Sequence, residues 1–358
     1  MTSRRRLCAA LALGALLGPG SVAARGTVKR DAPTSPFSLA RRRGPARAGV
    51  DGDDARNATE TDAATGERAP LARRTVPSSG TTLPCIGMGT WITFDLPPEH
   101  PERATRVEVV RRFLAAGGGM IDSSPMYGHA EELVGHALAR THRTDAVASD
   151  DRDAVGTLFE ASKIWTPIGF RGPAQLAGTE RLWGRRPMAL MQVHNLVAWR
   201  DHLPRLHRWR REGRIGHLGV TTSHGRRHAE LEALLESEAR ADRTPDFVQL
   251  TYNARDREAE RRLLPLAREL GIAVIANRPL QRGAIPRDNA RRPLPALAAE
   301  LGCRSWAQLA LLFVVSHPDV TCAIPATGVP AHLDENMAVG RLSMPDARTR
   351  DEIARAIG

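Results

Sequence analysis

The sequence predicts an α/β fold of the (β/α)8 TIM barrel class, and three observations lead to that prediction. From residue 75 onward, short apolar runs alternate with longer amphipathic stretches whose apolar residues recur every three or four positions. Eight such runs occur, and strands that are apolar throughout are typical of parallel sheets covered by helices. An open doubly wound sheet is the competing arrangement, but no GxGxxG motif follows any predicted strand. The count of eight therefore favours closure into a barrel.

The eight predicted strands are bounded by turn residues and lie in chain order through the second part of the sequence. They cover residues 83–91, 118–125, 157–165, 188–195, 215–222, 246–253, 272–279 and 320–327.

Helices are predicted between these strands. Residues 101–118, "PERATRVEVVRRFLAAGG", have a proline at their start and glycines at their end, which is the favoured punctuation of a helix. Residues 257–271, "REAERRLLPLARELG", place four leucines and an alanine on one side. Before the first strand, residues 74–85, "RTVPSSGTTLPC", predict a β-hairpin that covers the N-terminal end of the barrel.

The chain divides into three predicted segments: a leader at 1–24, a disordered linker at 25–74 and the barrel at 75–358. The leader combines three arginines, an apolar run and small residues, which is the layout of a secretory signal peptide of the twin-arginine type. We therefore expect a periplasmic protein, or one exported by that route. The alternative is an arginine-rich start without a targeting role, in a cytoplasmic protein. The linker has too few aliphatic residues to offset its chain entropy.

Composition argues against several other classes of protein. The net charge is +11, but the first 75 residues hold 14 of the 51 basic and 7 of the 40 acidic residues, so the rest is close to balanced. Without a helix-turn-helix or an aromatic and basic motif, no nucleic-acid partner is expected. No run after the leader approaches the roughly 20 apolar residues of a membrane span, so no stable membrane insertion is expected. The cysteines have no CxxC spacing and are expected to be core residues; they are Cys8, Cys85, Cys303 and Cys322.

Lysine is nearly absent from this chain. Of its 51 basic residues, 49 are arginine, and Lys163 is the only lysine outside the first 75 residues. It lies at the end of the third predicted strand, while Asp122 and His194 end the second and fourth. Tyr127 follows five residues after Asp122. Each has an ordinary structural explanation, as a helix cap, a core histidine or a loop anchor, but barrel active sites are built at these strand ends.

The motifs around these residues resemble those of the aldo/keto reductase family. They are "GMGTW" (87–91), "IDSSPMYG" (121–128), "ASK" (161–163), "QVHN" (192–195), "LGVTT" (218–222), "VQLTYN" (248–253), "RPLQRG" (278–283) and "IPATGVPAHLDEN" (324–336). The resemblance implies an NAD(P)H-dependent enzyme that reduces an aldehyde or ketone to an alcohol, with a catalytic tetrad at Asp122, Tyr127, Lys163 and His194.

Physical reasoning supports these implied roles. Reduction needs an acid beside the carbonyl oxygen, and a close ammonium favours the phenolate of a tyrosine, so Lys163 is expected to lower the pKa of Tyr127. Asp122 would hold the ammonium, and His194 would orient the carbonyl oxygen. Arginine at position 163 would keep the charge but not the compact ammonium.

The resemblance also implies cofactor contacts. Those expected at the nicotinamide end, the pyrophosphate and the adenosine end are Gly89, Thr90, Trp91, Thr221, Thr222, Gln249, Arg278, Pro279, Leu280, Thr327, Glu335 and Asn336. Five positions depart from the family pattern. Thr221 and Thr222 stand where the family commonly has Ser-Asn. Asn277 stands where an aromatic residue often stacks on the nicotinamide. Ala326 and His332 stand where a lysine and an arginine often bind the 2′-phosphate of NADP. NADP(H) is favoured because most members of the family use it, and NAD(H) is the alternative. Arg278 is expected to reach the pyrophosphate or, alternatively, to form a surface salt bridge.

The substrate is constrained only loosely by the sequence. Trp91, Met126 and Trp165 are expected to form an apolar pocket wall for a small carbonyl compound, and we expect a monomer. One rival function is a cofactor-binding barrel that acts as a subunit or sensor with little turnover. A second is a metal-dependent barrel hydrolase with ligands among His129, His194 and His224, but only His194 lies at a strand end, so no metal is expected.

Overall fold

The computed structural model describes residues 69–145 and 158–358, with side chains up to residue 141 in the first range. The predicted leader (1–24) and the predicted linker up to residue 68 lie outside the described residues. The last residues of the predicted linker belong to the barrel instead: Leu71 is buried in its core, and the first strand begins at Arg73. The Arg73 guanidinium donates a hydrogen bond to the Thr82 carbonyl, 2.8 Å away.

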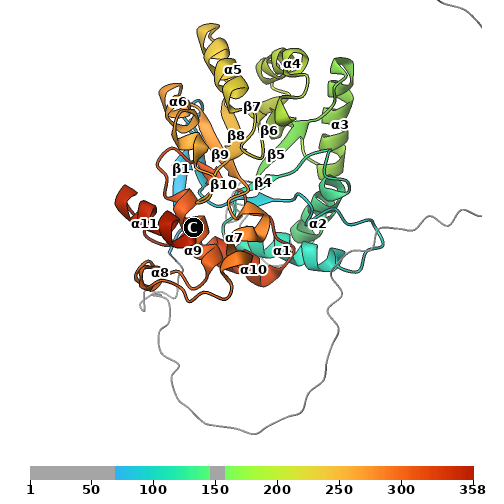
Figure 1. The fold of residues 1–358 in the computed structure, drawn as a ribbon. Coiled ribbons are helices and arrows are strands. Elements are labelled where there is room, and N and C mark those ends of the chain that lie inside the picture. Colours follow the sequence, from blue (N-terminus) through green and yellow to red (C-terminus); the bar gives the residue numbers. More distant parts are fainter. Residues whose placement is uncertain (1–68, 146–157) are drawn as a thin grey trace, which may run out of the picture. The chain divides into compact units, whose positions relative to one another are not determined.

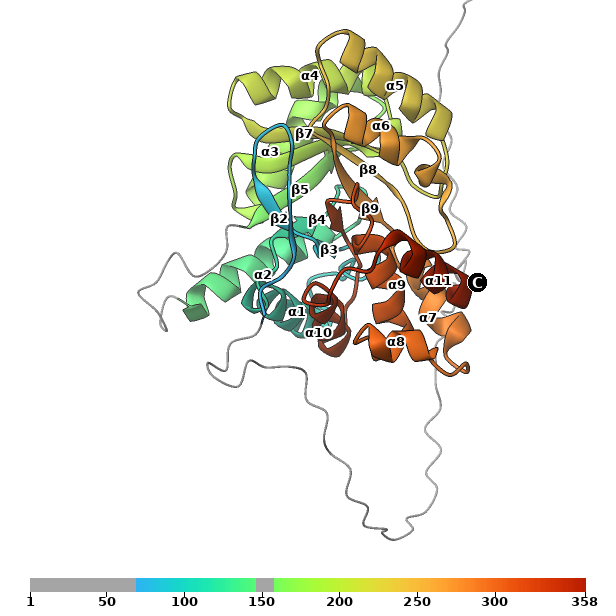
Figure 2. The ribbon, with the colours of Figure 1, turned by 90° about the vertical axis from the view of Figure 1, so that its left-hand side faces the viewer.

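The predicted hairpin is present and lies against the N-terminal end of the barrel (Figure 2). It consists of the antiparallel strands β1 (Arg73–Thr75) and β2 (Thr82–Pro84). Val76 and Leu83 from this hairpin are buried with the side chains that fill the barrel interior. The Ser79 hydroxyl lies 2.9 Å from His217 Nε2 of a barrel strand. The hairpin therefore closes the end of the barrel opposite to the site described below.

The eight predicted barrel strands are confirmed as one parallel sheet (Figure 1). Each neighbour in the sheet is also the neighbour in sequence, from β3 to β10. Isolated bridges from Ile86 to Ala323 and from Gly89 to Ala326 join the first strand to the last and close the barrel. The bounds are β3 (Met88–Gly89), β4 (Met120–Asp122), β5 (Phe159–Ile164), β6 (Met188–Val193), β7 (Ile215–Thr221), β8 (Phe247–Thr251), β9 (Ala273–Asn277) and β10 (Cys322–Ala323).

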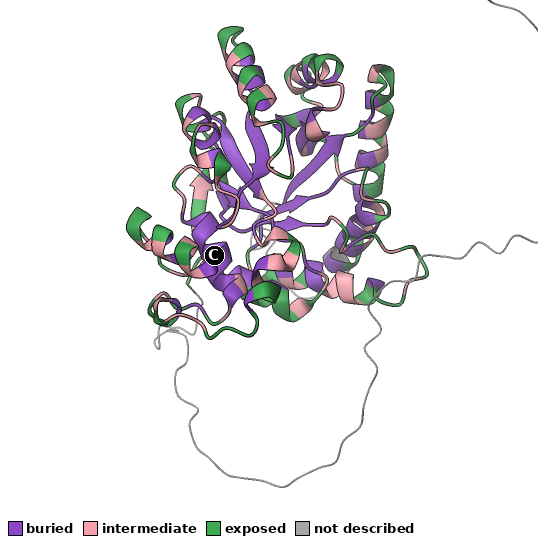
Figure 3. Ribbon diagram, viewed as in Figure 1, coloured by how far each residue is buried: buried purple, intermediate pink, exposed green. Residues whose placement is uncertain are grey.

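Helices surround the sheet and turn their apolar sides toward it (Figures 1 and 3). The first predicted helix is α1, and the predicted helix at 257–271 is divided into a 3-10 turn (Glu258–Glu260) and α6. The division follows from Pro265, which has no N–H and is tolerated only in the first turn of α6. The helices are α1 (Arg103–Ala115), α2 (Ala130–Asp145), α3 (Gly172–Trp183), α4 (Trp199–Arg211), α5 (His228–Arg240), α6 (Leu263–Glu269), α7 (Ala284–Asn289), α8 (Ala296–Glu300), α9 (Trp306–Val315), α10 (Pro330–Val339) and α11 (Ala347–Ile357).

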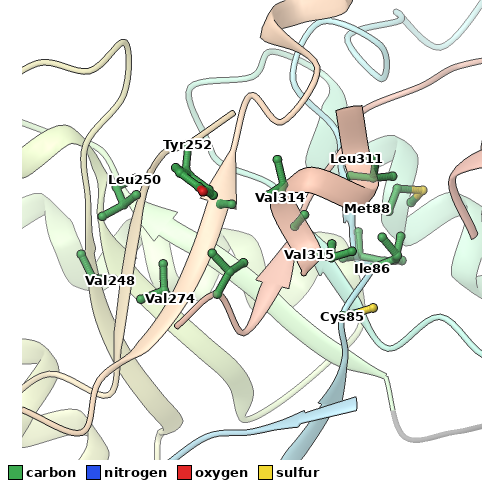
Figure 4. Close-up of a cluster of buried hydrophobic side chains, with 14 of the residues drawn as sticks. Cys85, Ile86, Met88, Val248, Leu250, Tyr252, Val274, Leu311, Val314 and Val315 are labelled. Atoms are coloured by element: carbon green, nitrogen blue, oxygen red, sulfur yellow. The ribbon is translucent and has the colours of Figure 1, made fainter. Parts of the chain in front are cut away.

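The core has two layers. The outer layer lies between strands and helices, and Figure 4 shows part of it, including Val248 and Leu250 of β8 and Val314 and Val315 of α9. The inner layer fills the barrel, and at its N-terminal end Phe159, His217 and Phe247 contact one another with ring centroids 5.3 to 5.6 Å apart. This aromatic group fills the barrel at its N-terminal end, and the residues of the predicted tetrad lie at the opposite end. Three of the four cysteines are described, and they are buried and free, as expected of core residues.

Candidate active site

The four residues predicted to form the tetrad lie together at the C-terminal ends of neighbouring strands. Asp122 is the last residue of β4, Lys163 is the fifth of the six residues of β5, and His194 directly follows β6. Tyr127 lies in the loop between β4 and α2. Parallel strands place their carboxyl ends at one rim, which explains why residues up to 72 positions apart in sequence meet here.

Lys163 and Asp122 form a buried ion pair. Lys163 Nζ lies 2.5 Å from Asp122 Oδ2 and donates a second hydrogen bond to the Ser123 carbonyl at 2.8 Å. The side-chain amides of Gln192 and Gln249 donate to the other Asp122 oxygen at 3.2 and 2.9 Å. Burial alone would lower the pKa of Lys163, but Asp122 and Tyr127 beside it raise the pKa above its ordinary value. The ammonium thus stays charged and has a fixed position.

Tyr127 lies beside this ammonium, with Lys163 Nζ 5.2 Å from the centre of its ring. Lys163 does lower the pKa of Tyr127, as expected, but burial outweighs that effect and the pKa lies above its ordinary value. The lowering contribution of Lys163 agrees with the sequence expectation, although the net shift is upward. The phenol is protonated at neutral pH, which is the form that can donate a proton.

His194 is neutral and is hydrogen-bonded to a neighbouring serine. Its Nδ1 lies 2.9 Å from the hydroxyl oxygen of Ser124, which also accepts the Met126 N–H at 3.2 Å. When the Ser124 hydroxyl donates to Nδ1, the ring hydrogen resides on Nε2 and is available to a second partner. Burial, assisted by Lys163, lowers the pKa of His194 to about 2. The imidazole is neutral and packs edge-on against Tyr127, with centroids 5.6 Å apart.

A cavity of about 920 Å³ opens over these residues. Asp122, Tyr127 and His194 line it, while Lys163 lies behind them with no exposed surface. The cavity extends from β3 and β4 to the loops around α7, α9 and α10. All of the predicted cofactor contacts line it, namely Gly89, Thr90, Trp91, Thr221, Thr222, Gln249, Arg278, Pro279, Leu280, Thr327, Glu335 and Asn336.

Comparison of the chain with known protein families shows the family to which it belongs. The model of the family described as "Aldo/keto reductase family" matches residues 85–165 and 179–355, which is most of the chain. The chain belongs to the aldo/keto reductase family. It is accordingly an oxidoreductase, and the family's common activity is the NAD(P)H-dependent reduction of carbonyl compounds.

Individual aldo/keto reductases resemble the chain at low identity. The "NADH-specific methylglyoxal reductase" of Escherichia coli (strain K12) is 24% identical over 320 residues, which cover 74% of this chain and 92% of that protein. An aldo-keto reductase from Klebsiella pneumoniae in complex with NADPH superposes with a TM-score of 0.63 at 22% identity, covering 81% of this chain and 95% of that one. The glycerol dehydrogenase of Gluconobacter oxydans gives 0.63 at 18%, covering 80% and 94%. These structures support the barrel fold.

This aldo/keto reductase departs from the sequence prediction at Trp165. Met126 and Trp91 line the cavity, but Trp165 does not; its side chain is 42% exposed. The backbone of Trp165 both donates to and accepts from the Gln175 side chain, at 2.9 and 2.7 Å. These bonds fix the loop after β5 against α3.

Asn277, which replaces the usual aromatic residue, has both ends of its side chain occupied. Its Nδ2 donates to the Thr222 carbonyl at 2.9 Å, and its Oδ1 accepts from the Thr251 hydroxyl at 2.8 Å. It joins three strand ends. Arg278 has no carboxylate within 4 Å in the described part of the chain, so the alternative of a surface salt bridge is not observed.

Several cavity residues were not predicted. Asn195, Ser223 and His224 follow β6 and β7, and the motifs around those strand ends could have indicated them. Four unpredicted arginines also line the cavity: Arg282, Arg287, Arg292 and Arg304. Arg282 lies in the motif "RPLQRG", but no sequence pattern distinguishes the other three in a chain with 49 arginines. Among the residues that the structure describes, no cluster of three potential metal ligands occurs, and no helix is both long and apolar enough to span a bilayer.

Proposed function

We propose that this enzyme reduces an aldehyde or ketone with Tyr127 as the proton donor. The observation that carries the proposal is the buried Lys163 and Asp122 ion pair beside a protonated phenol that faces the cavity. A buried ion pair stabilises a fold poorly, because desolvation offsets most of the attraction. Its position next to Tyr127 gives it a chemical purpose that stability alone does not.

Each side chain then has one task. The reduced nicotinamide, when bound, supplies hydride to the carbonyl carbon. His194 Nε2–H orients the carbonyl oxygen, and Tyr127 donates its proton to that oxygen as negative charge develops. The Lys163 ammonium stabilises the phenolate that remains, while Asp122 keeps the ammonium in place. In the oxidation of an alcohol, the same phenolate would act as the base.

The cavity fits a dinucleotide cofactor. Its volume is at the upper end of ordinary ligand pockets, and all the positions expected to contact the cofactor line it. Thr221, Thr222 and the free oxygen of the Gln249 amide would face the carboxamide, since the Gln249 nitrogen is bonded to Asp122. The segment with Pro279 and Leu280 would follow the pyrophosphate.

We further propose NADP(H) as the preferred cofactor. Ala326 and His332 lack the permanent charges that often bind the 2′-phosphate. Three other arginines line the cavity and could supply such a charge, namely Arg287, Arg292 and Arg304. Arg304 precedes α9, which is joined to α10 by the hydrogen bond from Gln308 to the Glu335 carbonyl. Its guanidinium has no carboxylate partner in the described part of the chain. Phosphate recognition depends on such charge-assisted bonds.

Cofactor choice is tested by steady-state kinetics with both cofactors. We expect at least a tenfold higher kcat/KM with NADPH, and we expect Arg304→Gln to remove most of that preference. The neighbour from Klebsiella pneumoniae binds NADPH, whereas the Escherichia coli relative is NADH-specific, so relatives leave both options open. Equal or better use of NADH would refute the preference.

Turnover itself separates the enzyme from a cofactor-binding subunit or sensor. Stopped-flow mixing of the NADPH complex with a panel of reactive aldehydes and ketones should oxidise the bound cofactor in one rapid phase. A chain that binds NADPH tightly but oxidises none of it with any carbonyl compound would be a binding module.

We also propose that the arginine-rich leader directs export by the twin-arginine route. That route carries folded proteins, so the barrel could leave the cytoplasm with its cofactor bound. Cell fractionation should recover a shortened chain from the periplasm, and a full-length cytoplasmic chain would contradict the proposal.

A further inference from the structure

Two arginines share one tryptophan at the catalytic end of the cavity. The guanidinium carbons of Arg278 and Arg282 lie 4.9 and 4.8 Å from the centre of the Trp91 ring. That ring lies 6.5 Å from the ring of Tyr127, centre to centre. Two like charges on one indole repel each other, and together with burial this repulsion lowers the pKa of Arg278. Another favourable interaction is needed to explain why both are kept here.

No carboxylate compensates these charges. In the described part of the chain neither arginine has an acidic partner within 4 Å, although Arg106, Arg112 and Arg262 each have at least one. The cavity has only two carboxylates in its lining. Asp122 is bonded to Lys163, and Glu335 lies on α10, at the other end of the cavity. The catalytic end therefore has two guanidinium groups without an anionic partner, because its one lining carboxylate, Asp122, is already paired with Lys163.

The backbone holds the two arginines in place. Arg278 and Arg282 have positive φ angles of 54° and 59°, a conformation that non-glycine residues rarely adopt. The Arg278 carbonyl accepts hydrogen bonds from Gln281 N–H at 2.9 Å and from the Asn253 side chain at 3.2 Å. Backbone conformations of this kind persist mainly at ligand sites, where the surrounding structure fixes them.

The histidines at this end supply no positive charge that could replace the arginines. His194 is neutral, and the pKa of His224 is lowered by burial and by Arg278, Arg226 and Arg282. Beside the arginines the cavity is apolar, with Ile92 and Met126 in its lining. A ligand that meets Tyr127 with its carbonyl group would thus meet guanidinium groups within a few atoms of it.

We propose that Arg278 and Arg282 form an anion-binding subsite for the substrate, so that the enzyme prefers carbonyl compounds that carry a carboxylate. This inference rests on the proposed carbonyl reduction and adds its substrate class. It also gives the Arg278 side chain a different ligand from the pyrophosphate expected from the sequence. The pyrophosphate would then contact the backbone of this segment and the arginines farther along the cavity.

The test uses pairs of substrates with the same aldehyde and a different charge. 4-Formylbenzoate is compared with its methyl ester, and glyoxylate with methyl glyoxylate, with the full chain and saturating cofactor. We expect kcat/KM to be at least tenfold higher for each acid than for its ester. The preference should decrease as ionic strength rises, because exposed charges are screened by salt.

Variants then assign the preference to residues. Arg278→Gln and Arg282→Gln should each reduce the ratio of acid to ester kcat/KM about tenfold, and Arg278→Lys should restore part of it. A ratio cancels any general loss of activity. Arg304→Gln, at the other end of the cavity, is the matched control: it should weaken cofactor binding, measured by NADPH fluorescence, and leave the ratio unchanged. Titration calorimetry with benzoate should show binding that both subsite variants lose.

Two outcomes would overturn the inference. Acids and esters reduced with equal kcat/KM would mean that no anion subsite operates, while the proposed carbonyl reduction would still stand. A ratio unaffected by Arg278→Gln and Arg282→Gln, with a large increase in the Kd of NADPH, would assign these arginines to the pyrophosphate. Reduction of neither acid nor ester would contradict the proposed function itself.

Discussion

The chain has only two tyrosines, and each lies beside a cation and a carboxylate. Tyr127 faces the cavity next to Lys163 and Asp122. Tyr252 is fully buried under α11, where its hydroxyl donates to Glu260 and accepts from Arg350 (Figure 4 shows the ring). Burial raises the pKa of both phenols, and the neighbouring cation opposes the effect in both.

The difference lies in what the carboxylate touches. Glu260 accepts the proton of Tyr252 in a hydrogen bond, so that phenol has no donor left for a ligand. Asp122 bonds to the lysine and to two glutamine amides, and the structure records no hydrogen bond between it and Tyr127. The same three groups, a phenol, a cation and a carboxylate, can therefore form either a buried structural network or a proton donor for a ligand. The outcome depends on whether the carboxylate accepts the hydrogen bond of the phenol.

The largest effect that would sharpen this comparison is expected from Tyr127→Phe. Removal of the proton donor should reduce the rate of carbonyl reduction by about 10²- to 10⁴-fold, as is usual for loss of a general acid. Single-turnover oxidation of bound NADPH measures it. NADPH affinity and the urea midpoint should change little, and a variant with a normal rate would exclude Tyr127 as the acid.

Replacement of the cation beside Tyr127 should give the next largest effect. Lys163→Arg is expected to fold normally but lose most reductase activity, about 100-fold, because the planar guanidinium cannot occupy the space of the ammonium between Asp122 and Tyr127. The matched control is Arg350→Lys beside Tyr252, which should lower stability and leave kcat unchanged. Near-normal turnover of Lys163→Arg would mean that the charge alone is required at this position.

Tyr252→Phe should affect stability alone. It removes the hydroxyl that joins Glu260 and Arg350, and the loss of buried hydrogen bonds is expected to cost about 1–3 kcal/mol in the free energy of unfolding. Denaturant titration measures that cost, and kcat should remain within about twofold of the parent. A large loss of activity without a loss of stability would contradict the structural role.

The smallest effect is expected when the pH is varied between 5 and 9, where kcat/KM should change little. The form of Tyr127 that donates is the protonated one, so activity is present below its pKa and lost as pH rises through it. Because that pKa is raised, the falling limb of kcat/KM should lie above pH 10. His194, with a pKa of about 2, should add no transition near pH 6.5. A limb near 6.5 that His194→Gln abolishes would show that this histidine ionises during catalysis.

The barrel and the residues at its rim could be predicted because both depend on local pattern. Strand ends meet at one rim in any such barrel, so Asp122, Lys163 and His194 could be brought together from sequence alone. The net direction of the Tyr127 pKa could not, because it depends on burial by residues from several strands. Trp165 does not line the cavity, and the course of its loop depends on tertiary bonds with Gln175 that the sequence does not reveal. Arg304 was missed because one arginine in an arginine-rich chain has no distinguishing pattern.

The burial of Lys163 has a practical consequence. It is the only lysine after Lys29, and its side chain has no exposed surface in the folded barrel. An amine-reactive reagent can therefore modify this one residue only when the barrel opens. The rate at which the peptide that contains Lys163 is labelled would therefore report the rate of barrel opening at Nζ of this residue, without any engineered probe.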